Sequence, residues 1–89
     1  MFNLEDALYA GMLLGVTFDK FSPNEFLEGI NIELEHGTVN YLTNVTNDDL
    51  LTTAKIALAH LNEYPNYYNK EYGLTKFEEM LKNKLKNDY

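Results

Sequence analysis

The chain contains no cysteine and no tryptophan among its 89 residues. Without thiols it can form neither a disulfide framework nor a cysteine-based metal cage, so a reducing compartment places no constraint on it. It also lacks any apolar run near the roughly 18 residues that would indicate a membrane-spanning helix. Its first residues include two acids, Glu5 and Asp6, where a secretory signal would carry positive charge. We therefore expect a cytoplasmic protein without a membrane anchor.

Arginine is also absent, and 14 acidic residues outnumber 7 lysines, which gives a formal net charge of −7. Arginine forks are the usual ligands of phosphate and guanine, and a strongly acidic surface repels a polyanion. This composition argues against direct nucleic-acid binding. The imbalance is confined to residues 1–69, with ten acids and two lysines, because residues 70–89 carry four acids and five lysines.

A chain of this length with 45% hydrophobic residues has enough apolar side chains for one small core. The apolar residues recur at helical spacing, and no internal repeat or second domain is evident. The sequence therefore predicts an all-α fold, a compact single-domain bundle of four or five short helices that covers residues 1–89.

The first predicted helix covers residues 4–14. Asn3 is a suitable N-cap, and Gly15 is suited to end the helix in a left-handed conformation. The residues that recur at helical spacing form one apolar stripe that should face the core, and they are Leu4, Leu8, Gly11 and Met12. In the connector that follows, the aromatic rings of Phe18 and Phe21 should close the edge of the core.

The second predicted helix, residues 23–36, begins at a Ser-Pro pair and should stop at Gly37. Its apolar face consists of Phe26, Ile30 and Leu34. At about 3.6 residues per turn, Glu33 lies between Phe26 and Ile30 on this face. Burying a carboxylate without a partner is costly, so a metal, a histidine, a lysine or backbone donors should lie beside Glu33.

The third predicted helix follows a polar loop and ends before Pro65. Thr46 is its predicted N-cap, with Asp48 and Asp49 in its first turn, and we assign these three polar residues a structural role. The apolar stripe of the helix is formed by Leu50, Ala54, Ala57 and Leu61. Its small residues, together with Gly29 on the second helix, should allow another backbone to approach closely.

The C-terminal part is predicted to form a short helix over residues 66–72 and a lysine-rich helix over residues 75–87, capped by Thr75 and boxed by Glu78. The apolar face of the last helix consists of Phe77, Met80, Leu81 and Leu85. A group of tyrosines lies just before it, namely Tyr64, Tyr67, Tyr68 and Tyr72. These rings either bind a partner or complete the core while their hydroxyls stay near the surface.

Both histidines lie three residues from a glutamate, in mirrored order: Glu33 precedes His36, and His60 precedes Glu63. Side chains three apart share a helix face, so on two packed helices the four could converge. One interpretation is a four-ligand site for zinc or another divalent metal. In the other, His36 is a helix C-terminal residue favoured by the dipole, and His60 is hydrogen-bonded to Glu33 or to a loop carbonyl.

Three groups of residues form a distinctive pattern. They are Glu33-Leu34-Glu35-His36-Gly37; Thr43-Asn44-Val45-Thr46 with Asp48-Asp49; and Ala59-His60-Leu61-Asn62-Glu63 with Pro65 and Tyr67-Tyr68. The pattern resembles a family of short bacterial and bacteriophage proteins classified as a domain of unknown function. The resemblance covers about residues 10–70 and leaves out residues 73–89, while Leu50, Ala54 and Asn66 depart from it. It implies a bacterial or phage accessory protein and brings no activity.

Three classes of function remain. The first is a small acidic accessory protein that binds an unidentified protein partner, and the second is a divalent-metal-binding protein that uses the two Glu–His pairs. The third is an inhibitor that mimics nucleic acid, which requires acids such as Asp6, Asp19, Glu28 and Glu35 to form one exposed band. The histidines are accompanied by no nucleophile elbow or oxyanion-hole motif, which argues against an enzyme. An exposed apolar strip on the last helix would indicate a homodimer.

Overall fold

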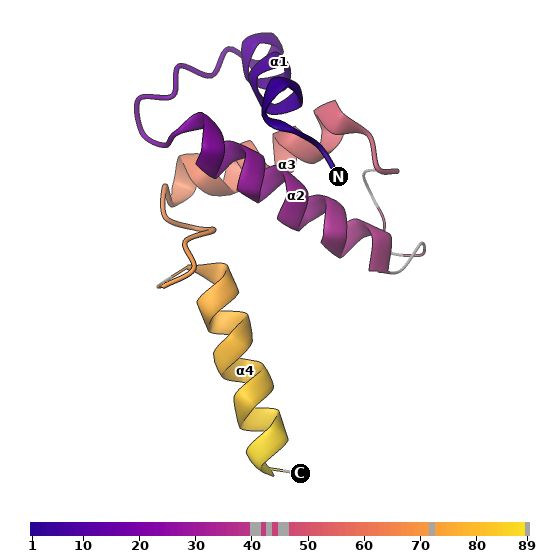
Figure 1. Ribbon diagram of the computed structural model, residues 1–89, viewed down its shortest axis with the longest axis vertical. Helices are drawn as coiled ribbons and strands as arrows, with labels where there is room; N and C mark the ends of the chain where they lie inside the picture. Colours follow the sequence, from indigo (N-terminus) through magenta and orange to yellow (C-terminus); the bar gives the residue numbers. More distant parts are fainter. Residues whose placement is uncertain (40–41, 43, 45–46, 72, 89) are drawn as a thin grey trace.

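The computed structural model describes residues 1–39, 42, 44, 47–71 and 73–88, with side chains described as far as Leu85 in the last helix. This part of the chain forms four α-helices and contains no strand. The helices are α1 (Leu4–Leu14), α2 (Pro23–Val39), α3 (Leu50–Glu63) and α4 (Leu74–Asp88). The predicted all-α, single-domain fold is thus confirmed, and Figure 1 shows α1, α2 and α3 gathered together while α4 leads away from them.

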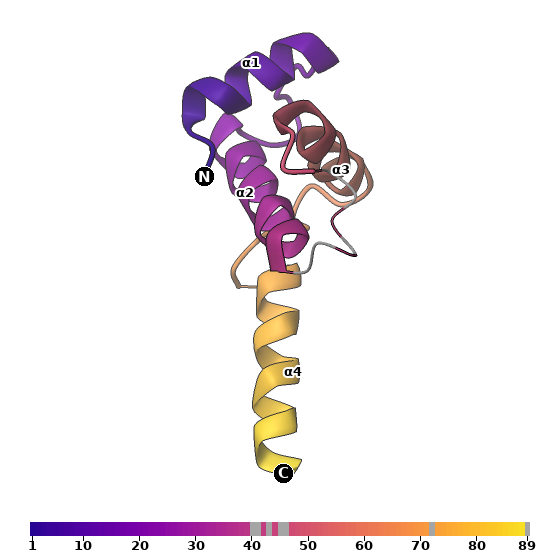
Figure 2. The same cartoon turned by 90° about the vertical axis from the view of Figure 1, so that its right-hand side faces the viewer.

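The core lies between α2 and α3, and α1 packs against both (Figure 2). Phe26 and Ile30 of α2 and Leu61 of α3 are among its largest fully buried side chains. The predicted apolar faces of these two helices are therefore confirmed. Phe18 and Phe21 of the connector close one end of the core, with ring centroids 5.8 and 5.9 Å from that of Phe26.

The first helix begins and ends at its predicted caps. The side chain of Asn3 accepts the Asp6 N–H at 2.9 Å, and the Asp6 carboxylate accepts the Asn3 N–H at 2.9 Å. This reciprocal box satisfies amides that a helix start would otherwise leave unpaired. Gly15 ends the helix with φ at 72°, in the left-handed region that suits glycine.

The face with which α1 meets the core differs from the predicted one. Its buried residues are the small ones, Ala7, Ala10 and Gly11. The predicted Leu4, Leu8 and Met12 are instead between 40% and 69% exposed. Gly11 is buried as predicted, and the prediction is wrong for the three large residues. Helical spacing does not fix which edge of the stripe meets the core, and close packing decides it: a Cβ added at Gly11 would lie 2.8 Å from Cζ of Phe18.

Two helix boundaries also differ from the prediction. α2 continues through Gly37, which is buried, to Val39. α3 starts at Leu50 with Asp49 as its N-cap, because the Asp49 carboxylate accepts the Thr52 N–H at 2.9 Å and its hydroxyl at 2.8 Å. These bonds hold the pKa of Asp49 below its ordinary value. The predicted cap at Thr46 is therefore wrong, and Thr46 itself lies outside the described residues.

Between α3 and α4 the chain forms turns, where a short helix was predicted. The Asn69 N–H donates to the Asn66 carbonyl at 2.9 Å, and the Leu74 N–H donates to the Tyr67 carbonyl at 2.6 Å. This pattern is not the i to i−4 ladder of an α-helix. α4 then starts at Leu74, so Thr75 lies inside its first turn and does not cap it.

α4 stands apart from the rest of the molecule (Figures 1 and 2). Within the described part of the chain, α1, α2 and α3 contact one another, but none of them packs along α4. Leu74 still packs against the core, while Phe77, Met80, Leu81 and Leu85 are between 46% and 58% exposed. No helix among the described residues is both long and apolar enough to cross a membrane.

Candidate functional site

Glu33, His60 and Tyr68 form a polar cluster where α2, α3 and the following turns meet. The Glu33 side chain, from the core-facing side of α2, is only 10% exposed. His60 Nδ1, from the last turn of α3, lies 3.0 Å from Glu33 Oε2, and the Tyr68 hydroxyl donates to the same oxygen at 2.5 Å. The cluster thus joins three segments that are distant in sequence, because His60 follows Glu33 by 27 residues and Tyr68 follows it by 35.

The hydrogen-bond geometry assigns a donor to each contact. His60 Nδ1 also lies 2.9 Å from the Tyr68 hydroxyl, whose proton is already directed to Glu33. Nδ1 therefore carries a proton and donates toward the two oxygens, and Nε2 of a neutral ring is then the acceptor. Glu33 therefore has hydrogen-bond partners, as its place on the apolar face requires. The contact also matches the alternative in which His60 is hydrogen-bonded to Glu33 and holds no metal.

Two tyrosines enclose the imidazole. The Tyr67 ring stacks on His60 with ring centroids 4.3 Å apart, and Tyr68 meets Tyr67 edge to face. Burial, followed by the Glu33 hydrogen bond and charge, raises the pKa of Tyr68 well above its ordinary value. Burial and the charge of Glu33 also raise the pKa of Tyr67. The hydroxyl of Tyr68 is therefore turned into the cluster, contrary to the prediction that the tyrosine hydroxyls lie near the surface.

Tyr68 also explains Gly29. A Cβ added at Gly29 would lie 2.5 Å from Cε2 of the Tyr68 ring and 2.7 Å from its Cδ2. The close approach predicted at Gly29 is therefore made, but by a side chain and not by another backbone. The ring fills the space that the missing side chain of Gly29 leaves on α2, and this contact positions the hydroxyl beside Glu33.

The four predicted metal ligands are only partly brought together. His36 Nδ1 lies 3.7 Å from Glu33 Oε1, and its Nε2 lies 3.7 Å from a carboxylate oxygen of Glu78 in α4. Glu63 is exposed and acts on the cluster through its charge, which contributes to the raised pKa of Tyr67. Among the residues that the structure describes, no group of three or more carboxylates and imidazoles is placed to hold a metal ion. A metal site at these residues stays a prediction that the geometry does not favour.

The predicted structural role of the acidic pair before α3 has a geometric basis. Asp49 is the N-cap of α3, and the carboxylate of Asp48 accepts a hydrogen bond from the Asn44 side-chain amide at 2.8 Å. Asp48 has φ at 62° and Asn47 has φ at 53°, a left-handed conformation that Asn and Asp tolerate better than most residues. Polar contacts within the chain therefore occupy both carboxylates.

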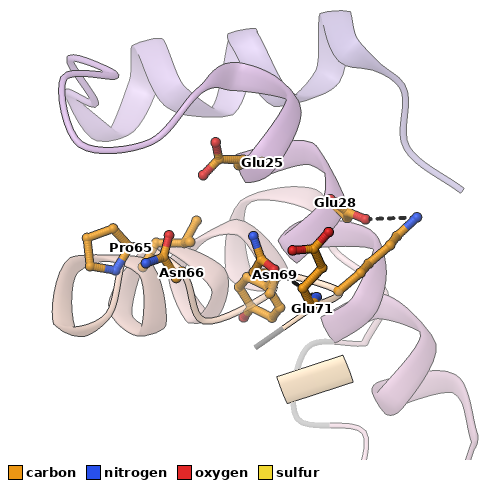
Figure 3. A pocket seen from close by; sticks show the side chains of 9 residues that line it. Glu25, Glu28, Pro65, Asn66, Asn69 and Glu71 are labelled. Atoms are coloured by element: carbon orange, nitrogen blue, oxygen red, sulfur yellow. Dashed lines mark hydrogen bonds and ion pairs between the residues drawn. The ribbon is translucent and has the colours of Figure 1, made fainter. Parts of the chain in front are cut away.

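A shallow hollow of about 400 Å³ lies on the other side of Tyr68, between α2 and the turns (Figure 3). Its rim carries Glu25 and Glu28 from α2 and Glu71 from the turns. Lys70 Nζ pairs with Glu28 at 3.4 Å across this rim. No sequence pattern pointed to this hollow, because its walls come from two segments that only the fold of the chain brings together.

A family model described as a protein of unknown function, DUF5661, matches residues 7–80. The chain belongs to DUF5661. The match confirms membership of a family of unknown function, and it reaches further than the predicted residues 10–70, since it includes the first half of α4. No curated protein matches this DUF5661 chain, and no solved structure does either.

Membership of DUF5661 assigns no activity to the polar cluster. Carboxylate, imidazole and phenol are groups of acid–base catalysis. In this DUF5661 domain, however, the Tyr68 proton and one Glu33 oxygen are engaged with each other and with His60. These contacts are suited to holding α2, α3 and the turns together. The bacterial or phage origin implied by the resemblance stays a prediction.

Replacing Glu33 with glutamine should destabilise the protein. Glutamine removes the charge that accepts two donors, and hydrogen bonds to charged groups contribute about 1.5–3 kcal/mol. Because the amide oxygen of glutamine still accepts one donor, we expect a loss of about 1–2 kcal/mol in unfolding free energy, measured by urea denaturation. Glu35→Gln, on the exposed side of the same helix, is the matched control and should stay within about 0.5 kcal/mol. Equal effects of the two substitutions would refute the buried role of Glu33.

Alkaline pH should reduce the contribution of Tyr68 to the free energy of unfolding. Its folded-state pKa is raised, so above a pH of about 10 the unfolded chain loses the tyrosine proton while the native protein keeps it. The stabilisation is complete below that pH and is lost as pH rises. The difference in unfolding free energy between wild type and Tyr68→Phe should therefore shrink between about pH 9 and pH 11. A constant difference over this range would contradict the assignment, and Tyr64→Phe, at an exposed position, serves as the control.

Proposed function

We propose that this protein is a small accessory protein that acts by binding another protein, and that the outer face of α1 is the binding surface. One observation carries the proposal: α1 buries its small residues and exposes its large apolar ones. The exposed side chains of this face, between 40% and 69% exposed, are Leu4, Leu8, Tyr9, Met12 and Leu13.

Such a face is unusual for a helix that serves only its own domain. A surface helix normally turns its apolar stripe to the core and its polar residues to water. In α1, Ala7, Ala10 and Gly11 achieve close packing, so the larger side chains contribute little to the core that they adjoin. Single exposed apolar residues are ordinary, but a contiguous group of them is typical of an interaction site.

The charge around this face specifies the chemistry of the partner. α1 contains two acids, Glu5 and Asp6, and no lysine, and residues 1–69 carry ten acids against two lysines. A partner that presents an apolar patch with a basic rim would bury the α1 face and meet complementary charge around it. The same field would accelerate association at low ionic strength.

The experiment compares capture of protein partners by wild type and by Leu8→Asp or Met12→Asp. Both positions are exposed, so the melting temperatures of the variants should stay close to that of wild type. Asn24→Asp, at a polar position on α2, adds the same charge elsewhere and is the matched control. We expect a partner that wild type and Asn24→Asp retain and that both α1 variants lose. Retention by all four proteins, or by none, would overturn the proposal.

The other two functional classes gain no support from the side-chain contacts. Three of the four acids named for a nucleic-acid mimic have local partners: Asp6 caps α1, Asp19 accepts the Thr17 hydroxyl at 2.8 Å, and Glu28 pairs with Lys70. The metal-binding alternative depends on the two Glu–His pairs, but Glu33 and His60 contact each other and Tyr68, whereas Glu63 is exposed. The apolar face of α1 is therefore the feature that most favours one function.

A further inference from the structure

The exposed apolar stripe of α4 is a second surface that the described part of the chain leaves uncovered. Its four members are separated by at most four residues along the helix and share one of its faces, and they are Phe77, Met80, Leu81 and Leu85. They continue from Leu74, which packs against the core, into a helix that leads away from the globule (Figure 2). This stripe is separate from the α1 face, so the identity of its occupant is independent of the proposed function.

We propose that the stripe is covered by α4 of a second copy of this chain, in an antiparallel pair with Leu81 at its two-fold axis. Phe77 and Leu85 lie one helical turn before and after Leu81. Antiparallel pairing about Leu81 therefore sets Phe77 of each copy against the partner's Leu85. Three of the four members, Phe77, Leu81 and Leu85, are thus symmetrical about one residue, which suits a self-complementary, isologous interface.

The charges along α4 select the antiparallel direction. The first half of the helix carries Glu78 and Glu79 against one lysine, Lys76, for a net charge of −1. The following residues carry Lys82 and Lys84 and no acid before Asp88. Antiparallel pairing sets the acidic half of each helix beside the basic half of the other, and opposed helix dipoles also favour it. Parallel pairing would align like charges along the whole contact.

The charge of the globule formed by α1, α2 and α3 also favours antiparallel pairing of α4. Residues 1–69 carry a net charge of −8, from ten acids and two lysines. Because α4 leads away from this globule, antiparallel pairing places the two globules at opposite ends of the helix pair (Figure 1). It also brings the lysines of each α4 toward the acidic globule of the partner. Parallel pairing would bring the two acidic globules together, where they repel each other.

A hollow at the base of α4 adds apolar surface for the same occupant. Tyr64, Tyr67, Leu74 and Phe77 line it, and Phe77 is also the first member of the stripe. In the antiparallel pair, the partner's Leu85 arrives beside Phe77, at the mouth of this hollow. The Tyr67 ring, which stacks on His60, would then border the interface on one side and the polar cluster on the other.

Single-cysteine variants test the arrangement cleanly, because the chain has no cysteine of its own. Leu81→Cys should form a disulfide-linked dimer with itself under mild oxidation, since the two-fold axis passes beside this residue. Asn83→Cys is the matched control, because residue 83 is exposed and lies about 160° around the helix from Leu81. Rapid linking of Leu81→Cys alone supports the pair. Equal linking of both variants, or of neither, overturns it.

Light scattering of proteins without an introduced cysteine measures the oligomeric state independently. Over a micromolar to millimolar series, wild type should approach twice its monomer mass of 10.3 kDa, and Leu81→Asp should remain at the monomer mass while keeping its helical circular dichroism. Asn83→Asp should behave as wild type. A wild type that stays monomeric throughout overturns the proposal. So does a disulfide between Leu81→Cys and Met12→Cys in a mixture of the two variants, because α1 would then be what covers α4.

Discussion

Replacing Tyr68 with alanine is expected to lower the unfolding free energy by about 3–5 kcal/mol, the usual cost of removing a buried aromatic ring. The Tyr68 side chain is 3% exposed, fills the space above Gly29 and donates its hydroxyl to Glu33. Its removal leaves a cavity and takes one donor from a carboxylate that is itself mostly buried. For a domain whose total stability is about 5–15 kcal/mol, this loss would unfold a large fraction of molecules on mild heating.

Urea denaturation of Tyr68→Ala and Tyr64→Ala provides the comparison. Tyr64 belongs to the same group of tyrosines but is exposed, so its replacement should change stability by no more than about 0.5 kcal/mol. The large difference expected between these neighbouring tyrosines comes from the burial of Tyr68 and its bond to Glu33. Similar losses at the two positions would show that Tyr68 does not occupy the core.

Gly29→Ala should destabilise the protein by about 2 kcal/mol, although alanine is the better helix former. Alanine gains about 1 kcal/mol of helix propensity over glycine inside a helix. Its Cβ, however, would lie 2.5 Å from the buried ring of Tyr68, and overpacking of a core costs up to about 3 kcal/mol. The ring cannot swing aside cheaply, because its hydroxyl is held at Glu33.

The same substitution in a Tyr68→Ala background separates the clash from any other effect. Once the ring is absent, the added methyl group meets open space, and Gly29→Ala should become neutral or stabilising by up to about 1 kcal/mol. The sign of the effect should therefore reverse between the two backgrounds. The same destabilisation in both would mean that something other than Tyr68 crowds Gly29.

Local sequence patterns predicted the helices and also predicted that Glu33 has a polar or charged partner. Helix caps at Asn3 and Gly15, and the apolar faces of α2 and α3, depend on residues a few positions apart, so the sequence reveals them directly. A carboxylate on an apolar face requires a partner, and a histidine was among the candidates for it. Tyr68 was missed as that partner because it follows α3 by several residues of irregular chain.

The errors share a physical cause. The apolar face of α1 was assigned by helical spacing, but Ala7, Ala10 and Gly11 allow closer packing than large residues do, so the helix turns these small residues to the core. Glycine often ends a helix, yet α2 continues through Gly37, which is buried. Each outcome is decided by contacts with distant segments, which spacing along one helix does not encode.

The metal hypothesis illustrates the same limit. Mirrored Glu–His pairs indicate that four side chains share two helix faces, but they do not fix how far those faces are rotated toward each other. The packing of α2 on α3 brings His60 to Glu33 and leaves Glu63 exposed. The sequence could predict a polar contact between α2 and α3. Which residues form that contact depended on the rotation of α3 about its axis.

A double-mutant cycle on Glu33→Gln and Tyr68→Phe tests the polar cluster most directly. Unfolding free energies of wild type, both single variants and the double variant give the coupling between the two side chains. If the Tyr68 hydroxyl donates to the Glu33 carboxylate, the double variant should lose at least about 1 kcal/mol less than the sum of the single losses. Strictly additive losses would contradict the account, because they would mean that the two groups do not interact in the folded protein.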